Sequence, residues 1–354
     1  MANRVEVEPY GRAQAFASWS RKNPDPLRRV EGGRMNDSEA RSSPRTFTEA
    51  ARSSHGLRDR TTPPAGLSMN HRSHMPRPLV PVLLVIGVLL ASLPSGLVSS
   101  TSDVTAQQVP GHEAFTRVLD RVVQMPRVDY AALEADREGL DAYLESLART
   151  SEADLEASPR EVQLAFWINA YNACMLKLVI DHYPIQAGGT GLFGAIRNRV
   201  AGYPDNSVWQ IRNVFTRTHC RVAGEDRSQD EIEHEIIRPR FDEPRIHFAV
   251  NCAALSCPPL WPMAYTADQL DEQLDRAVRH LMAGEGHFRI EEGPPPTLRL
   301  NRVLDWYSED FGGTEGLKTF FADYLSGDRR DRVLNPDTRV EFFEYDWTLN
   351  DTRR

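Results

Sequence analysis

Residues 165–180 read AFWINAYNACMLKLVI, a segment that is apolar on nearly every side of a helix. Ser158 can cap the N-terminus of this helix and Pro159 suits its first position. Pro184 disfavours helical backbone in the residue before it. A helix without a polar face must be covered by other elements. The sequence therefore predicts a buried central helix over residues 158–182, around which the rest of the fold packs.

The remaining apolar patterns predict several amphipathic helices and a few short strands. The helices are expected at residues 112–125, 131–148, 229–238, 266–283, 303–311 and 316–325, and the strands at 245–251, 287–291, 297–300 and 340–345. Helices come first, and strands mixed with helices follow. This order favours an α+β protein, mainly helical with a small mixed or antiparallel sheet, in a single compact domain.

The chain divides into three parts by composition. Residues 1–68 are rich in Arg, Ser, Pro and Gly, which predicts either a disordered tail or an upstream extension wrongly included in the reading frame. Residues 69–106 combine a basic start, a short apolar run and a Val-Thr-Ala end, as a secretory signal peptide does. An uncleaved N-terminal anchor is the alternative. Residues 107–354 are expected to form a single globular domain that is periplasmic or secreted, or anchored to the inner membrane and facing outward.

The charge of the chain is unevenly distributed. Residues 1–106 carry 14 Lys and Arg against 9 Asp and Glu, and the remaining residues carry 28 against 41, a net charge of −13. An acidic domain is a poor partner for nucleic acid or for anionic lipid. We therefore expect a peptide or another cell-envelope ligand, no nucleic acid, and a membrane contact only through the N-terminal segment if that segment is not cleaved.

Several motifs occur together in the predicted domain. They are VDY (128–130), AFWINAYNA (165–173), IEHEIIRP (232–239), RIHFAVNCAALSCPPL (245–260), VLDWYSEDFG (303–312) and YDWTLND (345–351). In sequence and order this set resembles the domain of unknown function 547 family. The resemblance implies an uncharacterised domain and supplies no particular activity or catalytic residues.

The four cysteines leave the thiol chemistry open. Cys174 lies within the apolar helix and is expected to be a buried free thiol. Cys252 and Cys257 are close enough in sequence to form a disulfide if the chain turns between them. Alternatively, Ser256-Cys257-Pro258 begins a helix, and the backbone N–H groups of that helix stabilise a reactive Cys257 thiolate.

A reactive thiol needs a base, and two histidines are candidates. On a regular strand His247 and Asn251 share one face, opposite Cys252, which argues against a direct contact between His247 and Cys252. Either His247 or His234 is then expected to meet Cys257 across the turn.

Four further residues are candidates for binding or orientation. His234 is followed one turn later by Arg238 and preceded by Glu233, so these residues either point into a cleft or form a solvated face. Asn169 and Asn172 share one face of the central helix and either hold loop backbone or line a site.

No cofactor or metal is expected. The cysteines and histidines lack CxxC and HExxH spacing, and the chain has no GxGxxG, Walker or GxSxG motif. The aromatic-acid motifs near Trp306 and Tyr345 either pack in the core or form a groove for sugar or peptide.

Two functions stay open at this point. One is a thiol-dependent hydrolase or acyl transferase on peptide or amide bonds, with Cys257 as nucleophile, His234 or His247 as base, and Asn169 or Asn251 as orienting group. The other is a non-catalytic binding or scaffolding domain with a structural Cys252–Cys257 turn.

Overall fold

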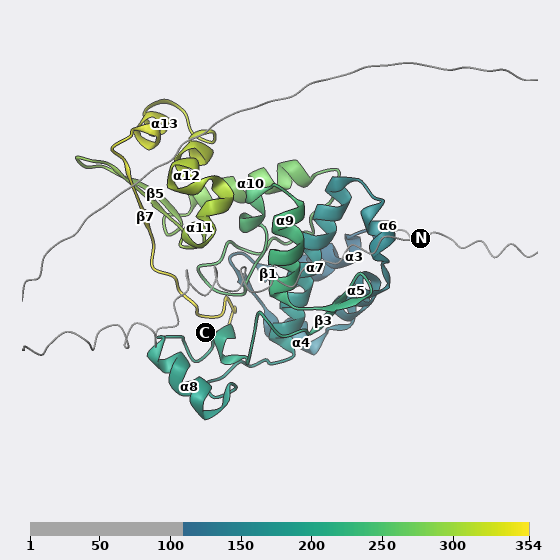
Figure 1. Ribbon diagram of the computed structural model, residues 1–354. Helices are drawn as coiled ribbons and strands as arrows, with labels where there is room; N and C mark the ends of the chain where they lie inside the picture. The colour runs from purple at the N-terminus through teal and green to yellow at the C-terminus, as the bar shows by residue number, and fades with distance from the viewer. Residues whose placement is uncertain (1–108, 354) are drawn as a thin grey trace, which may run out of the picture. The chain divides into compact units, whose positions relative to one another are not determined.

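The computed structural model describes residues 109–353 (Figure 1). The expectations for residues 1–68 and 69–106 lie outside the described residues, and the single domain over 107–354 stays a prediction. Between residues 109 and 353, no helix is both long enough and apolar enough to cross a membrane.

The predicted central helix is confirmed as α7 (Arg160–Ile180), which runs through the middle of the helical part in Figure 1. Sixteen of its 21 residues are buried, so apolar and aromatic side chains face neighbours on every side. The prediction that Ser158 caps this helix and Pro159 takes its first position is wrong. Pro159 occupies the N-cap position, and the Ser158 hydroxyl instead donates to the Asp154 carbonyl at 2.9 Å.

Four helices and two hairpins surround α7 and share one hydrophobic cluster with it. The helices are α3 (Glu113–Val122), α4 (Tyr130–Ala135), α5 (Glu138–Arg149) and α6 (Glu152–Glu156), and the hairpins pair β1 (Val123–Gln124) with β2 (Arg127–Val128) and β3 (Cys220–Val222) with β4 (Glu225–Arg227). The single helix predicted over 131–148 is therefore two helices. The chain leaves helical geometry at Asp136 (φ −139°, ψ 81°), whose carbonyl accepts from Arg121 at 2.6 Å.

A second hydrophobic cluster covers a three-stranded sheet. In it, β5 (Phe288–Glu291) pairs antiparallel with β6 (Thr297–Leu300), and β6 pairs parallel with β7 (Arg339–Phe342). The helices of this part are α10 (Leu270–Ala283), α11 (Val303–Trp306), α12 (Gly313–Ala322) and α13 (Gly327–Leu334), with the 3-10 helix η4 (Ser308–Phe311). The described residues thus confirm a mainly helical α+β fold with small sheets.

The strand predicted over 245–251 is wrong. Pro244–Phe248 form the 3-10 helix η3, which begins at a proline and is capped where the Glu243 side chain accepts from the Arg245 backbone N–H at 3.2 Å. Every residue from Ile246 to Val250 is buried, so the segment has no outward face of the kind that a half-buried strand would show. The face argument that separated His247 from Cys252 therefore does not apply. Phe248 packs in the second cluster while Ile246 packs in the first, so η3 connects the two.

The helix predicted over 229–238 forms with an unexpected geometry. A π-helical turn, η2 (Glu231–Ile237), continues into the short helix α9 (Arg238–Arg240), so Pro239 lies within the helical segment instead of ending it. Ser228 and Glu231 form a capping box at its start: the Ser228 N–H donates to the Glu231 carboxylate at 2.7 Å, and the Glu231 N–H donates to the Ser228 hydroxyl at 3.2 Å.

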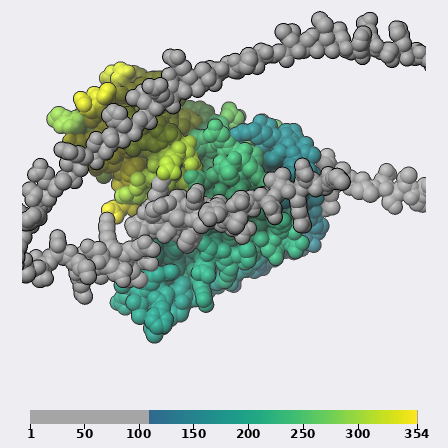
Figure 2. All heavy atoms as spheres, in the orientation of Figure 1, coloured from purple at the N-terminus to yellow at the C-terminus, as the bar shows by residue number. Residues whose placement is uncertain are grey.

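The glycine-rich stretch between α7 and β3 contains helical turns that the sequence did not predict. They are α8 (Gly191–Val200) and the 3-10 helix η1 (Val208–Gln210). Leu192 and Phe193 on α8 are 75% and 88% exposed, and α8 lies at the surface of the described residues in Figure 2. Gly191 at the start of α8 and Gly202 just after its end both have positive φ, which glycine adopts without strain.

Candidate active site

One pocket opens to solvent where elements of the two hydrophobic clusters meet. Its wall combines Tyr171 of α7, residues of η2 and η3, and the end of α11. Aromatic rings from the C-terminal segment complete it, and the rings of Trp306 and Trp347 stack at 5.6 Å. Cys252, Cys257, His234, His247 and Glu233 all line this pocket, so the structure brings together five residues that the sequence singled out.

The two pocket thiols are in direct contact. The Sγ atoms of Cys252 and Cys257 are 2.9 Å apart, and both thiols are free. The Cys252 backbone N–H donates to Cys257 Sγ at 3.0 Å, and the Tyr345 hydroxyl lies 3.2 Å from Cys252 Sγ. The disulfide considered for this pair is therefore absent.

The turn between the thiols is built by side-chain and backbone contacts. Ala253 adopts the left-handed region (φ 63°), and its N–H donates to the Asn251 side chain at 2.9 Å. The Asn251 amide in turn donates to the Pro258 carbonyl at 2.8 Å. The expected helix at Ser256-Cys257-Pro258 does not form, because α10 begins only at Leu270. No helix N-terminus therefore stabilises a Cys257 thiolate.

The surroundings of the thiols favour ionisation of Cys252. The hydrogen bond between the two thiols lowers the pKa of Cys252 below its ordinary value, despite the opposing effect of burial, and Tyr345 adds to this lowering. Burial raises the pKa of Cys257 well above its ordinary value, and its contact with Cys252 adds to the rise. Cys252 is half-buried whereas Cys257 is 5% exposed. The more accessible, more acidic sulfur is thus Cys252, not the Cys257 that the sequence favoured.

His247 is fixed by an acid from the motif at 303–312. Its Nε2 lies 2.7 Å from an oxygen of Asp310, whose carboxylate also accepts two hydrogen bonds from Arg238 at 2.7 and 2.6 Å. Burial alone would raise the pKa of Asp310, but Arg238 and His247 hold that pKa well below its usual range. The His247 ring stacks on Tyr307 with centroids 4.0 Å apart.

These contacts set the tautomer of His247. An ionised Asp310 can only accept, so Nε2 of His247 carries the proton and Nδ1 carries the lone pair. Nδ1 has no hydrogen-bond partner among the described residues, and its nearest charged neighbour is a Glu233 oxygen at 3.9 Å. Burial lowers the pKa of His247, against the opposite effect of Asp310. The ring is thus a neutral base with a free nitrogen in the pocket wall.

His234 is held differently. Its Nδ1 lies 3.1 Å from Nη1 of Arg238, which can only donate, so the proton of a neutral ring is on Nε2. Burial lowers the pKa of His234; Glu233 opposes this effect, and the Arg238 charge adds to it. Arg238 therefore connects His234 to Asp310, which His247 contacts directly. Arg238 does not line the pocket.

Asp230 is a pocket acid that the sequence did not suggest. Burial raises the pKa of its carboxyl to about 7, and the neighbouring Glu233, Glu231 and Glu235 contribute to the rise. The sequence DEIEHE (230–235) shows that Asp230 is followed closely by three glutamates. It does not show that Asp230 is buried. At neutral pH this carboxyl is protonated in a substantial fraction of molecules.

The asparagines of α7 hold loop backbone and do not line the pocket. The Asn169 amide donates to the Tyr265 carbonyl at 2.7 Å and accepts from its N–H at 2.9 Å. Asn172 donates to the Ala249 carbonyl and accepts from the Asn251 N–H, both at 2.9 Å. The loop that carries the thiols is therefore anchored to the central helix.

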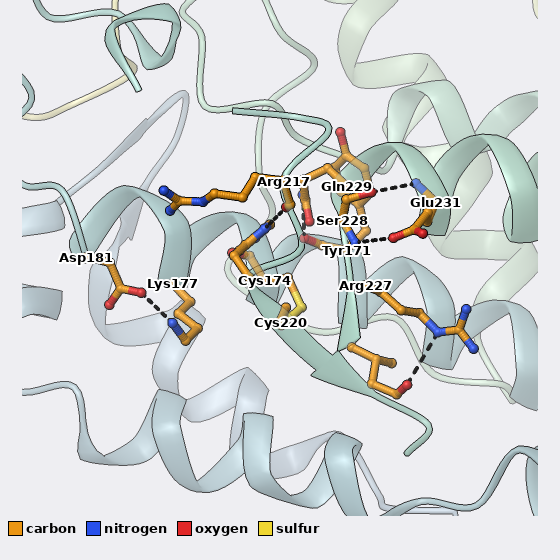
Figure 3. Close-up of a disulfide and its surroundings, with 12 residues drawn as sticks. Tyr171, Cys174, Lys177, Asp181, Arg217, Cys220, Arg227, Ser228, Gln229 and Glu231 are labelled. Carbon is orange, nitrogen blue, oxygen red and sulfur yellow. Dashed lines mark hydrogen bonds and ion pairs between the residues drawn. A yellow bond between two sulfur atoms is a disulfide. The ribbon is translucent and has the colours of Figure 1, made fainter. Parts of the chain in front are cut away.

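The prediction of a free buried thiol at Cys174 is wrong. Cys174 forms a disulfide with Cys220, which joins α7 to β3 (Figure 3). The two cysteines are 46 residues apart, across the glycine-rich stretch whose structure the sequence did not predict. Only the tertiary fold brings β3 beside α7.

No group of three or more His, Cys, Asp or Glu side chains within residues 109–353 is arranged to hold a metal ion. The residues present instead offer a thiol pair, two neutral imidazoles and a partly protonated carboxyl. This set suits nucleophilic and proton-transfer chemistry.

The fold and the pocket define a mainly helical α+β protein with a paired-thiol site. Residues 155–281 match the family described as "Protein of unknown function, DUF547". The match runs from the end of α6 almost to the end of α10 and includes both thiols and both histidines, which confirms the resemblance drawn from the motifs. No curated protein and no solved structure is similar enough to count as a match.

Proposed function

We propose that the pocket is the active site of a thiol-dependent hydrolase or acyl transferase and that Cys252 is its nucleophile. One observation carries the proposal: Cys252 Sγ is in contact with two potential donors, the Cys257 thiol at 2.9 Å and the Tyr345 hydroxyl at 3.2 Å, in a pocket that also contains neutral histidines. Donors of this kind stabilise a thiolate, which is the nucleophilic form of cysteine.

The pocket groups supply the remaining steps of acyl transfer. The Cys252 thiolate attacks the acyl carbon, and the C–X bond breaks as the leaving group takes a proton from Asp230, leaving a thioester. A water then attacks the thioester while Nδ1 of His247 accepts its proton. The Cys252 thiolate leaves, and the proton returns to Asp230 through solvent. Asp310 and Arg238 keep the His247 ring in the tautomer that this step requires.

The wall of the pocket indicates the substrate class. Trp306, Tyr307 and Trp347 offer ring faces, and Asp230 and Glu233 make the polar part of the wall acidic. This combination favours neutral or cationic peptide-like acyl groups over anionic ones. Export is part of the proposal: the Cys174–Cys220 disulfide supports an oxidising compartment, periplasmic or secreted, with an outward-facing anchored form as the alternative.

A binding function without catalysis has support of its own. Trp306, Tyr345 and Trp347 pack ring on ring beside the pocket, at 4.5 to 5.6 Å, as in a groove that stacks on a ligand. The structural version of this alternative, with a Cys252–Cys257 bridge, lacks the bridge. Aromatic stacking does not account for the distinct environments of the two sulfurs, so catalysis is the proposal that we favour.

The test is covalent trapping with the full chain. We would incubate it with a neutral aryl thioester at pH 7 and locate the acyl group by mass spectrometry. Cys252 should carry the adduct, and Cys252→Ser should reduce adduct formation by at least about 100-fold. Cys257→Ser is the matched control and should still form the adduct. Equal labelling of the Cys252→Ser variant, or no adduct on any cysteine, would refute the proposal.

A further inference from the structure

The paired thiols have a geometry that acyl transfer does not require. A disulfide needs an S–S distance of about 2.05 Å, and the Sγ atoms of Cys252 and Cys257 are already 2.9 Å apart. A side-chain movement of roughly 1 Å would close that gap. The other two of the four cysteines are already joined to each other. Cys252 and Cys257 are thus the chain's two free thiols, placed for reversible bond formation.

The two sulfurs also differ in the way that thiol–disulfide exchange requires. The half-buried Cys252 can meet a disulfide that enters the pocket, whereas Cys257 is buried behind it. Cys257 Sγ lies 2.9 Å from Cys252 Sγ, so it stands next to the atom that it would attack after Cys252 has reacted. Exchange proceeds by a first attack from an accessible thiolate and a second attack from a neighbouring thiol.

We propose that Cys252 and Cys257 are a redox-active pair that exchanges electrons with small disulfides bound in the aromatic pocket. Cys252 attacks one sulfur of a substrate disulfide, and the released thiolate takes a proton from water. Cys257 then attacks Cys252 Sγ in the mixed disulfide, and its proton goes to the second departing thiolate. The protein dithiol is oxidised to a disulfide, and the substrate disulfide is reduced to two thiols. An external thiol reverses the reaction.

The charges of the pocket select among disulfides. Asp230 and Glu233 line it, and the residues after 106 carry a net charge of −13. A cationic disulfide such as cystamine should therefore enter more readily than the anionic disulfide of glutathione. The Trp306 and Trp347 rings in the wall also offer faces to a cation.

This inference shares the nucleophile Cys252 with the proposed acyl transfer but does not need acyl chemistry. The two reactions compete, because oxidation of the pair consumes the thiolate. Cys257 distinguishes the two reactions. Disulfide exchange requires it as the resolving thiol, whereas formation of the acyl adduct does not require it.

The experiment uses the full chain in cystamine–cysteamine mixtures at pH 7, followed by rapid alkylation and peptide mass spectrometry. We expect a linked Cys252–Cys257 peptide that excess cysteamine reduces again, and faster oxidation by cystamine than by glutathione disulfide, by roughly tenfold. Cys257→Ser should accumulate a mixed disulfide on Cys252, and Cys252→Ser should react far more slowly at Cys257.

Three outcomes would overturn the proposal. The first is that no linked peptide forms in the folded wild-type chain. The second is that the pair oxidises but excess cysteamine does not reduce it, which would make it a structural staple. The third is that Cys257 reacts first. Since these readouts use the wild-type chain and two single variants, poor folding of one variant does not remove the test. Loss of exchange with retained acyl adduct on Cys252 would refute only this inference.

Discussion

At the scale of single residues, burial and hydrogen bonding decide which groups react. Cys252 and Cys257 are chemically identical in the sequence, yet their surroundings move their pKa values in opposite directions. The same holds for Asp310 and Asp230. Hydrogen bonds from Arg238 and His247 keep the pKa of Asp310 low, while burial raises that of Asp230 to about 7. Two carboxyls of one pocket region thus hold different protonation states at neutral pH.

Asp230 makes stability depend on pH. Its pKa is raised from 3.8 to about 7 by folding, so the folded chain holds this proton more tightly than the unfolded chain. The contribution is fully present below pH 4 and is lost as the pH rises to about 7. Relative to Asp230→Asn, wild-type unfolding free energy should fall over this interval, by at most roughly 4 kcal/mol.

Urea unfolding at several pH values between 4 and 8 checks this expectation. The exposed Asp205→Asn substitution is the control and should follow the wild type across the range. If the Asp230→Asn and wild-type curves stay parallel from pH 4 to 7, the raised pKa of Asp230 is wrong.

At the scale of elements, the central helix positions the thiol loop. Asn172 on α7 pairs with the Ala249 carbonyl and the Asn251 N–H, just before Cys252. Asn169, one helical turn away, makes the same pair of contacts with Tyr265, outside the thiol loop. Asn172 and Asn169 thus hold different loops by similar pairs of hydrogen bonds, and only the loop held by Asn172 carries Cys252.

Replacing either asparagine should lower the stability of the fold, but only the Asn172 replacement should change the alkylation rate of Cys252. Asn172→Ala leaves a buried carbonyl and a buried N–H without partners, which should lower the unfolding free energy by roughly 2–4 kcal/mol. It should also change the alkylation rate of Cys252 at pH 7 by severalfold. Asn169→Ala is the matched control: a similar loss of stability with an unchanged alkylation rate. Equal effects of both variants on alkylation would show that the rate reports general loosening of the fold.

At the scale of the whole described region, two hydrophobic clusters meet at η3 and the pocket lies between their elements. The Cys174–Cys220 disulfide ties β3 to the central helix across a segment that includes α8 and η1. Closing this long loop restricts the unfolded chain, and a bridge of this kind stabilises the folded state through that restriction.

Loss of the bridge should destabilise the fold without changing the pocket thiols. The double variant Cys174→Ala/Cys220→Ala should lose roughly 2–4 kcal/mol of unfolding free energy. Alanine is the suitable replacement because both sites are buried and a hydroxyl there would lack a partner. Guanidinium unfolding measures the loss, and alkylation of Cys252 in the folded variant should proceed at the wild-type rate. An unchanged unfolding midpoint would contradict the expected role of the bridge.

Local sequence patterns determined much of the secondary structure. The all-round apolar run fixes α7 as a buried helix, and the Ser228/Glu231 capping box fixes the start of η2. The pairing of 288–291 with 297–300 also follows from the sequence, because a short turn joins them. These features depend on contacts between residues near one another in the chain, so the local pattern contains the information that specifies them.

The tertiary structure decided the pairings between distant segments and the chemistry of the site. It brings Cys220 to Cys174, pairs β7 parallel with β6, and turns 245–251 into the buried 3-10 helix and loop that connect two cores. The sequence singled out the thiols and histidines that line the pocket, but it did not show that Cys252 has the lower pKa of the two sulfurs. The reason is physical: pKa and accessibility depend on which groups from other segments surround a side chain, and Tyr345 and Asp310 reach Cys252 and His247 from far along the chain.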